Sequence, residues 1–371
     1  MSTLKTPFRY DYVGSFLRPE ELKQARADHE AGHIDDAALK AMEDAAITEL
    51  IAKQKAAGYH VITDGEFRRS TWHLDFMWGF EGVGHKATER GLQFQGEAAK
   101  IDDTFLTGKI SLKEHPFVEH FKFVKQFEDE NTVAKQTIPA PAQFLEQFIM
   151  PMNAESTYQI YDSEEQLVAD IVAGYKQVIR ALYDAGCRNL QLDDCTWGLL
   201  VDDRNTQFFA TDEAGLERIK KLFLEINNLA IADKPEDMII NTHICRGNFH
   251  STWACSGPYD AIAELVFAKE NVDALYLEFD DARSGSFDCL RELSPDKKVV
   301  LGLVTTKSPV LEDKEKVIAR IREAAEIVPL ERLYLSPQCG FASCEIGNKL
   351  TEEEQWAKLA LVKEIAEEVW G

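Results

Sequence analysis

The sequence predicts an α/β fold, a single (β/α)8 TIM barrel with an elaborated insertion after its second strand. Short apolar runs alternate with amphipathic stretches of helical period along nearly all 371 residues, which is typical of βα units around a parallel sheet. Eight such units close naturally into a barrel. An open doubly wound sheet is the alternative, but the GxGxxG turn that usually follows its first strand is missing.

The eight expected strands are short apolar runs, several of them bounded by polar or glycine residues. They cover residues 11–15, 60–66, 132–140, 189–194, 238–245, 274–279, 299–304 and 332–340. The sequence predicts where several of the helices between them begin and end. Thr351 with Glu354, and Ser163 with Gln166, match the capping-box pattern, and Gly186 is expected to stop the helix that begins at Ser163.

Residues 67–131 interrupt this alternation with an aromatic-rich stretch that is too long for a plain βα loop. We expect them to form an insertion over the barrel mouth. Trp72, His73, Trp78 and Trp197 could line a pocket, but packing is the more common role of such aromatic residues. No short repeat, low-complexity segment or Pro/Ser-rich linker divides the chain. Residues 1–371 are therefore expected to form one catalytic domain.

The charge balance excludes two classes of partner. Lysine and arginine number 41 against 64 aspartates and glutamates, a formal net charge of −23, which repels nucleic acid and anionic membrane surfaces. No run approaches the roughly 18 unbroken apolar residues of a membrane helix, and the N-terminus lacks the apolar core of a signal peptide. The seven cysteines are odd in number and scattered, which favours a reducing, cytoplasmic location.

Polar residues at the carboxyl ends of the expected strands are the candidate site, because barrel enzymes place their active sites there. His243 and Cys245 lie two residues apart on one strand, so both side chains face the same side. Glu278 ends the next strand, and Cys339 ends the last one. One imidazole, two thiolates and one carboxylate suit tetrahedral zinc.

The complex of Zn²⁺ with two thiolates, one carboxylate and a neutral imidazole has a formal net charge of −1. This charge favours activation of a bound thiolate over strong Lewis acidity. A substrate thiol would lose its proton there near neutral pH and stay nucleophilic. Cys195 and Cys344 are rival thiols, and two buried neighbours in a core strand would produce the same HxC pattern as a metal site. The set is therefore a hypothesis for a zinc centre.

Glu66 and Asp193 end two other expected strands. Acidic groups at a barrel mouth are often simply solvated, but this pair could also bind a substrate ammonium group. Asp194 cannot face the same side as its neighbour in a regular strand. We therefore assign it to a helix-facing or capping role and select Asp193.

Several segments resemble the cobalamin-independent methionine synthase family. They are NTHICRGNF, LYLEFDDARSGS and LSPQCGFAS, supported by YVGSF, TDGEF and LQLDD. The resemblance implies a zinc-binding (β/α)8 barrel that methylates the thiol of homocysteine to form methionine. It implies zinc ligands at His243, Cys245, Glu278 and Cys339, and homocysteine binding by the Ser15 backbone together with Glu66 and Asp193.

The sequence also departs from that family. The chain has length for one barrel, whereas the long members have two, so the short methionine-synthase-like proteins are the closer comparison. Lys307 stands where the long members have a histidine thought to assist proton transfer. TIPAPAQF lacks their folate-contacting tryptophan. The methyl donor is therefore left open between methylfolate and a corrinoid-type donor.

Three other functions remain open. A zinc alkyltransferase acting on another thiol, such as coenzyme M, would have no ammonium group to match Glu66 and Asp193. A metal-free decarboxylase of the uroporphyrinogen type would need cations around its substrate, for which Arg68, Arg69 and Arg246 are available. A zinc-storage module would bind the ion without turnover. The sequence does not indicate an oligomeric state.

Overall fold

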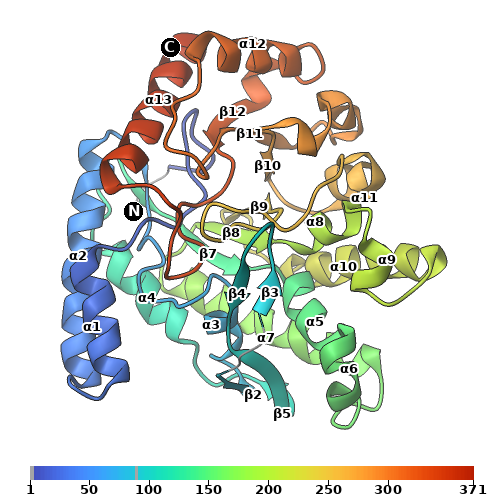
Figure 1. Ribbon diagram of the computed structural model, residues 1–371. Coiled ribbons are helices and arrows are strands. Elements are labelled where there is room, and N and C mark those ends of the chain that lie inside the picture. Colours follow the sequence, from blue (N-terminus) through green and yellow to red (C-terminus); the bar gives the residue numbers. More distant parts are fainter. Residues whose placement is uncertain (1–3, 88–90) are drawn as a thin grey trace.

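A parallel β-sheet surrounded by helices organises the protein (Figure 1). The computed structural model describes residues 4–87 and 91–371. Six parallel strands lie in the order β12-β11-β10-β9-β8-β7, and β1 pairs with β6 in a second parallel sheet. The strands are β1 (Val61–Ile62), β6 (Val133–Ala134), β7 (Gln136–Pro139), β8 (Asn189–Asp194), β9 (Ile239–Ile244), β10 (Ala274–Glu278), β11 (Lys298–Val304) and β12 (Leu333–Pro337).

The predicted α/β class is confirmed, and seven of the eight expected strand regions contain a strand at the predicted place. The strand expected over 132–140 is divided into β6 and β7 at Lys135. The strand pairings describe a six-stranded sheet and a separate two-stranded sheet, without a closed eight-stranded ladder in the described part of the chain.

The prediction of a strand over residues 11–15 was wrong. An isolated β-bridge between Tyr10, just before this segment, and Leu335 links it to the main sheet. Side chains take up its backbone groups instead. The Asp11 carboxylate accepts the Tyr12 N–H at 2.7 Å, and the Val13 carbonyl accepts from Gln191 at 2.9 Å. The segment nevertheless lies between the two sheets, because Asp11 N–H donates to Leu335 and Phe16 N–H donates to Gly65.

The helices form a layer around the strands, as Figure 1 shows. They are α1 (Glu20–Glu30), α2 (Asp36–Ala56), α3 (Leu74–Met77), α4 (Pro116–Lys125), α5 (Pro141–Ile149), α6 (Pro151–Thr157), α7 (Glu164–Asp184), α8 (Thr196–Val201), α9 (Asn205–Phe208), α10 (Glu213–Ile231), α11 (Asp260–Lys269), α12 (Lys314–Ala325) and α13 (Glu352–Trp370), with 3-10 turns η1 (Ala282–Ser284), η2 (Phe287–Glu292) and η3 (Leu330–Arg332). Buried apolar side chains between the helices and the strands form one large core.

Two predicted helix starts are confirmed. Thr351 caps α13 through a reciprocal capping box with Glu354, and Ser163 caps α7 by accepting the Gln166 N–H. Gly186 follows α7 with a φ of 97°, a conformation that favours glycine. Within residues 4–87 and 91–371, no helix has the length and apolar character needed to cross a membrane.

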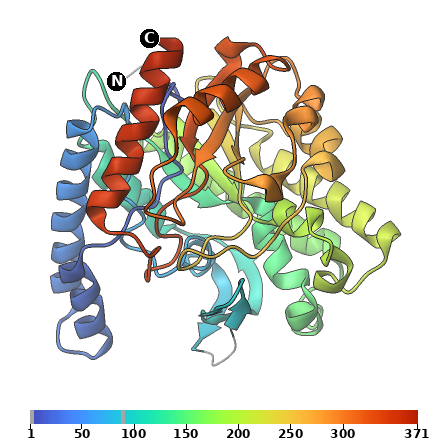
Figure 2. The ribbon, with the colours of Figure 1, turned by 45° about the horizontal axis from the view of Figure 1, so that its top comes forward.

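The stretch 67–131 contains α3, α4 and two small antiparallel sheets. One pairs β2 (Glu81–Lys86) with β5 (Asp103–Ser111), and the other pairs β3 (Gly91–Gln93) with β4 (Ala98–Lys100). These strands project at the bottom of Figure 2. The turn between β3 and β4 contacts the segment after β9, because Gln95 N–H donates to the Trp253 carbonyl and Glu97 pairs with His250 at 2.6 Å.

Replacing the cap of α13 tests how this helix is held. Thr351→Ala removes the hydroxyl that accepts the Glu354 N–H at 3.2 Å, and we expect it to lower the free energy of unfolding by about 1 kcal/mol. Urea denaturation measures the change. Thr48→Ala is the matched control, since its hydroxyl donates to Asp44 inside α2 and alanine favours a helix interior. Equal losses in both variants would contradict a capping role.

Candidate metal centre

Four side chains converge at the carboxyl ends of the strands. His243 lies in β9, and Cys245 follows that strand in register, with its N–H donating to the Asp194 carbonyl at 3.0 Å. Glu278 is the last residue of β10, and Cys339 follows β12 by two residues. Parallel strands end at one edge of a sheet, so side chains from three strands meet there.

Close approach between neighbouring strands depends on Gly302 in β11. A side chain there would come within 2.7 Å of the Leu277 carbonyl and of the Gln338 backbone. Gly302 pairs with Glu278 on one side and with Ser336 on the other. The glycine thus lets β10 and the end of β12 carry Glu278 and Cys339 to the same place.

The four donor atoms, from His243, Cys245, Glu278 and Cys339, all lie within 4.8 Å of one another, and all four residues are buried. The two sulfur atoms are 3.7 Å apart. Two sulfurs bound at about 2.3 Å to one tetrahedral ion would be separated by about 3.8 Å. The spacing of the thiols therefore fits a shared metal ion.

The imidazole of His243 supports the same conclusion. Its exposed fraction is 1%, and neither ring nitrogen has a hydrogen-bond partner among the described residues. Buried polar atoms nearly always have a partner, so an unpaired pair of nitrogens beside two thiols needs an explanation. A metal ion bound to one nitrogen would supply it.

The protonation of the two thiols depends on whether a cation is bound. The neighbouring thiol of Cys195 and burial raise the pKa of the Cys245 thiol, and Cys245 together with burial raises the pKa of Cys339. Both sulfurs thus hold their protons unless a cation stabilises the thiolates, so metal binding would release protons. Glu278 differs, because the charges of Lys307 and Arg283 outweigh burial and lower the pKa of its carboxyl.

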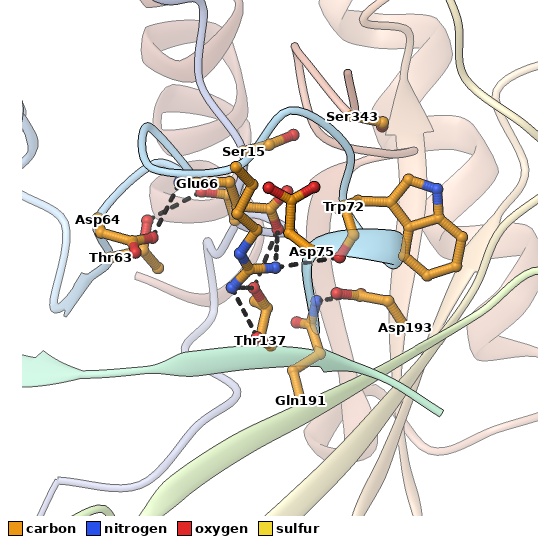
Figure 3. A network of polar contacts seen from close by, with 12 residues as sticks. Ser15, Thr63, Asp64, Glu66, Trp72, Asp75, Thr137, Gln191, Asp193 and Ser343 are labelled. Carbon is orange, nitrogen blue, oxygen red and sulfur yellow. Dashed lines mark hydrogen bonds and ion pairs between the residues drawn. The ribbon is translucent and has the colours of Figure 1, made fainter. Parts of the chain in front are cut away.

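The two acids predicted to bind an ammonium group line the same cavity as His243, Cys245 and Cys339. Figure 3 shows their contacts. Thr137 donates its hydroxyl to Glu66 at 2.9 Å, and Arg69 pairs with the same oxygen at 3.3 Å. The other oxygen of Glu66 has no hydrogen-bond partner among the described residues. Gln191 donates to Asp193 at 2.7 Å.

Burial raises the pKa of both acids to about 7, which marks them as groups that would gain from a cationic ligand. Ser15 lies in the same cavity. Its carbonyl accepts the Phe341 N–H at 3.0 Å, and its hydroxyl accepts the Ala342 N–H at 3.3 Å.

The cavity is narrow, about 20 Å³, which is room for the centre of little more than one water molecule. Its walls combine acids, thiols, an imidazole and one indole: Val13, Ser15, Glu66, Trp72, Asp193, Cys195, His243, Cys245, Asn248, Cys339, Gly340 and Ser343. Of the four ligand candidates, Glu278 lies behind this wall.

Lys307 follows β11 and lies outside the walls of this cavity. Its ammonium nitrogen is buried and has no hydrogen-bond partner within the described part of the chain. Its charge acts on the carboxyl groups of Glu278 and Asp280. Lys307 therefore lies near Glu278 and Asp280.

Other expected residues have structural roles. Asp194 accepts the Thr196 N–H at 2.9 Å and a side-chain N–H of Asn227 in α10 at 3.0 Å, the helix-facing role predicted for it. Trp197 is fully buried in the core, whereas Trp72 lines the cavity. Cys195 also lines it but lies outside the four-residue group, as does Cys344.

Two of the arginines offered for decarboxylation pair with carboxylates, and the third lies over an aromatic ring. Arg68 pairs with Glu43 and Asp44, Arg69 pairs with Glu66, and the Arg246 guanidinium lies 4.2 Å from the Tyr259 ring centre. None of the three is in the described lining of the cavity.

Sequence reasoning missed the partners of the acids. Arg69 lies three residues after Glu66, and Arg283 lies five residues after Glu278, donating to its carboxylate at 2.9 Å. A cation shortly after a strand-end acid was the available signal, in the segments TDGEFRR and LEFDDAR.

Residues 149–368, more than half of the chain, match the family described as "Cobalamin-independent synthase, Catalytic domain". The uncharacterized protein YxjH of Bacillus subtilis is 45% identical over 99% of this chain and 96% of its own length. The chain belongs to the cobalamin-independent methionine synthase family. Membership makes it a methionine-synthase-like methyltransferase, and the family is in general zinc-dependent.

Solved structures agree with this family. A Listeria monocytogenes protein, described as a candidate vitamin-B12 independent methionine synthase, is 37% identical, with a TM-score of 0.78 and 99% of each chain covered. A B12-independent methionine synthase from Shewanella, solved in complex with selenomethionine, has a TM-score of 0.72 at 19% identity and covers 98% of each chain. The second likeness shows the fold, which is of the TIM-barrel type.

The pH dependence of stability tests the environment of the two acids. Folding raises the pKa of Glu66 from about 4.5 to about 7, so between these values the native state binds more protons than the unfolded state. The metal-free protein is therefore expected to lose stability as the pH rises from about 4.5 through about 7. Glu66→Gln should make this decline shallower by on the order of 1–3 kcal/mol.

Urea midpoints at a series of pH values from 5 to 8 measure this difference. The matched control is Glu119→Gln, whose side chain is 74% exposed in α4 and which should follow the wild-type curve. A Glu66→Gln curve parallel to that of the wild type would show that folding does not raise the pKa of Glu66.

Proposed function

We propose that this protein transfers a methyl group to the thiol of homocysteine, with zinc as its cofactor, and forms methionine. The observation that carries the proposal is one cavity that joins His243 and two thiols to the paired acids Glu66 and Asp193. Such a site offers a sulfur-binding end and an ammonium-binding end, and homocysteine has both groups. The selenomethionine complex of the Shewanella relative supports it, since selenomethionine is an analogue of the product.

His243, Cys245, Glu278 and Cys339 would hold the zinc ion. Bound there, zinc would keep the substrate sulfur deprotonated near neutral pH while leaving it nucleophilic. The chain's own residues then orient the substrate. Holding the thiol in line with the donor methyl group supplies much of the rate, because an activated methyl donor needs little further assistance.

Glu66 and Asp193 would receive the substrate ammonium group. Both are buried with a pKa of about 7, so the arriving cation favours their ionised forms. Ser15 would contribute backbone contacts at the same end of the substrate. Lys307, whose charge acts on Glu278, would act as a proton donor when the methyl donor departs.

We further propose that the two parallel sheets and the segment after Tyr10 act as one (β/α)8 barrel within a single domain. Residues 67–131 would be an insertion over its mouth, as the contacts between Gln95 and Trp253 and between Glu97 and His250 suggest. All seven cysteines are free, which supports function in a reducing cytoplasm.

Metal analysis tests the cofactor. The purified wild-type protein, supplied with zinc and then desalted, should contain about one zinc per chain. Cys339→Ser should lose the ion, because a serine hydroxyl is a poor zinc ligand at neutral pH. Cys344→Ser is the matched control: it lies in the same loop but outside the donor group, and should keep the ion. A zinc-free wild type would contradict the proposal.

Turnover tests the substrate. Homocysteine should yield methionine with at least one of three donors, namely methylfolate, methylcobalamin or a methylated corrinoid protein, and monoglutamyl methylfolate should be the poorest. Asp193→Asn should raise the KM for homocysteine about 10- to 100-fold, through loss of a charged hydrogen bond. Asp184→Asn, at a half-exposed position on α7, is the control. Equal methylation of coenzyme M, which has no ammonium group, would contradict an amino-acid substrate.

A further inference from the structure

Arg283 lies directly behind the metal-ligand candidate Glu278. Its guanidinium donates to the Glu278 carboxylate at 2.9 Å and to the Asp280 carboxylate at 2.9 Å. The side chains of Arg283 and Glu278 are 7% and 0% exposed. This is therefore a buried, charge-assisted contact, and not one of the solvent-screened surface pairs that contribute little.

The loop after β10 presets the position of the arginine. Asp281 accepts the Arg283 N–H at 2.8 Å, which caps η1, and it also pairs with the Arg283 guanidinium. The Arg283 carbonyl accepts the Gly257 N–H at 3.0 Å, so the backbone is anchored on both sides. Gly285 ends the turn with a φ of 78°. Contacts within this turn therefore help to fix the position of the guanidinium, in addition to its contact with Glu278.

Both oxygens of Glu278 have a donor outside the metal cluster. Oε2 accepts from Arg283, and Oε1 accepts the Arg246 N–H at 3.0 Å. Arg246 directly follows the ligand candidate Cys245, so this second bond ties Glu278 to the HxC segment. Each carboxylate oxygen has two acceptor sites, and one remains on each oxygen. The carboxylate is thereby held in one orientation with its free acceptor sites available.

We propose that Arg283 is a positioning residue that holds Glu278 in the orientation of a metal ligand and so sets the affinity of the centre for zinc. The inference rests on the proposed zinc site and extends it to a residue that touches neither metal nor substrate. Residues that orient metal ligands commonly change metal affinity by 10–100-fold when replaced. Arg283 acts through Glu278, so its effect should depend on the presence of that carboxylate.

A double-mutant cycle on the full-length protein tests this dependence. Zinc dissociation constants are measured by competition with a chromophoric chelator for the wild type, Arg283→Met, Glu278→Gln and the double variant. We expect Arg283→Met to weaken zinc binding about 10–100-fold in the wild-type background and less than about twofold in the Glu278→Gln background. A structural role unrelated to Glu278 would weaken both backgrounds equally.

Arg291→Met is the matched control, since this arginine lies in the next turn, η2, and its side chain is 64% exposed; its zinc affinity should equal that of the wild type. Arg283→Lys keeps the buried charge but loses the planar guanidinium, whose Nη2 donates to Glu278 and Asp280 while Nη1 pairs with Asp281, and should weaken zinc binding about tenfold. If Arg283→Met does not fold, Arg283→Lys with and without Glu278→Gln decides by the same criteria.

The outcomes separate this inference from the proposed function. A wild type that binds zinc and methylates homocysteine, together with an Arg283 variant within about twofold of its zinc affinity, overturns the role of Arg283 alone. An equal loss in both backgrounds also overturns it. A wild type that binds no zinc overturns both proposals.

Discussion

The convergence of two thiols, one carboxylate and one imidazole on a single buried point is the constraint on which the rest of the site depends. Their donor atoms lie within 4.8 Å of one another, a distance at which two thiolates and a carboxylate would repel strongly in the absence of a cation. Strand ends impose this proximity, because Glu278 ends β10, and Cys245 and Cys339 come one and two residues after β9 and β12 of the same parallel sheet. A dication turns this mutual repulsion into binding.

Charge is arranged around that point on two sides. Arg283 and Lys307 lie on the side of Glu278 and keep its carboxyl ionised. Glu66 and Asp193 line the cavity, where burial raises the pKa of both acids to about 7. The site is thus prepared for two cations of different kinds, a metal on one side and an ammonium group on the other.

Sequence reasoning recovered what depends on local periodicity. Residues 189–194 form a strand with the predicted bounds, because leucines alternate with polar residues in NLQLDD at the two-residue period of a strand. The two-residue spacing of His243 and Cys245 gave their common direction, and the cap at Thr351 followed from its reciprocal pattern with Glu354.

Features that depend on long-range contacts could not be predicted. Residues 11–15 look like a strand, yet side chains such as Gln191 and Thr63 bond their carbonyls in place of a neighbouring strand. The division of the strand at Lys135 reflects a side chain that is buried between Asp11 and Gln191. Arg283 was overlooked although it lies only five residues after Glu278, since their contact depends on the turn at η1.

Zinc K-edge X-ray absorption of the wild-type protein, with and without homocysteine, tests the central claim most directly. The account predicts two sulfur ligands at about 2.3 Å together with nitrogen and oxygen ligands in the resting protein, and a third sulfur once homocysteine is added. A zinc shell without sulfur, or a sulfur number that homocysteine leaves unchanged, would contradict it.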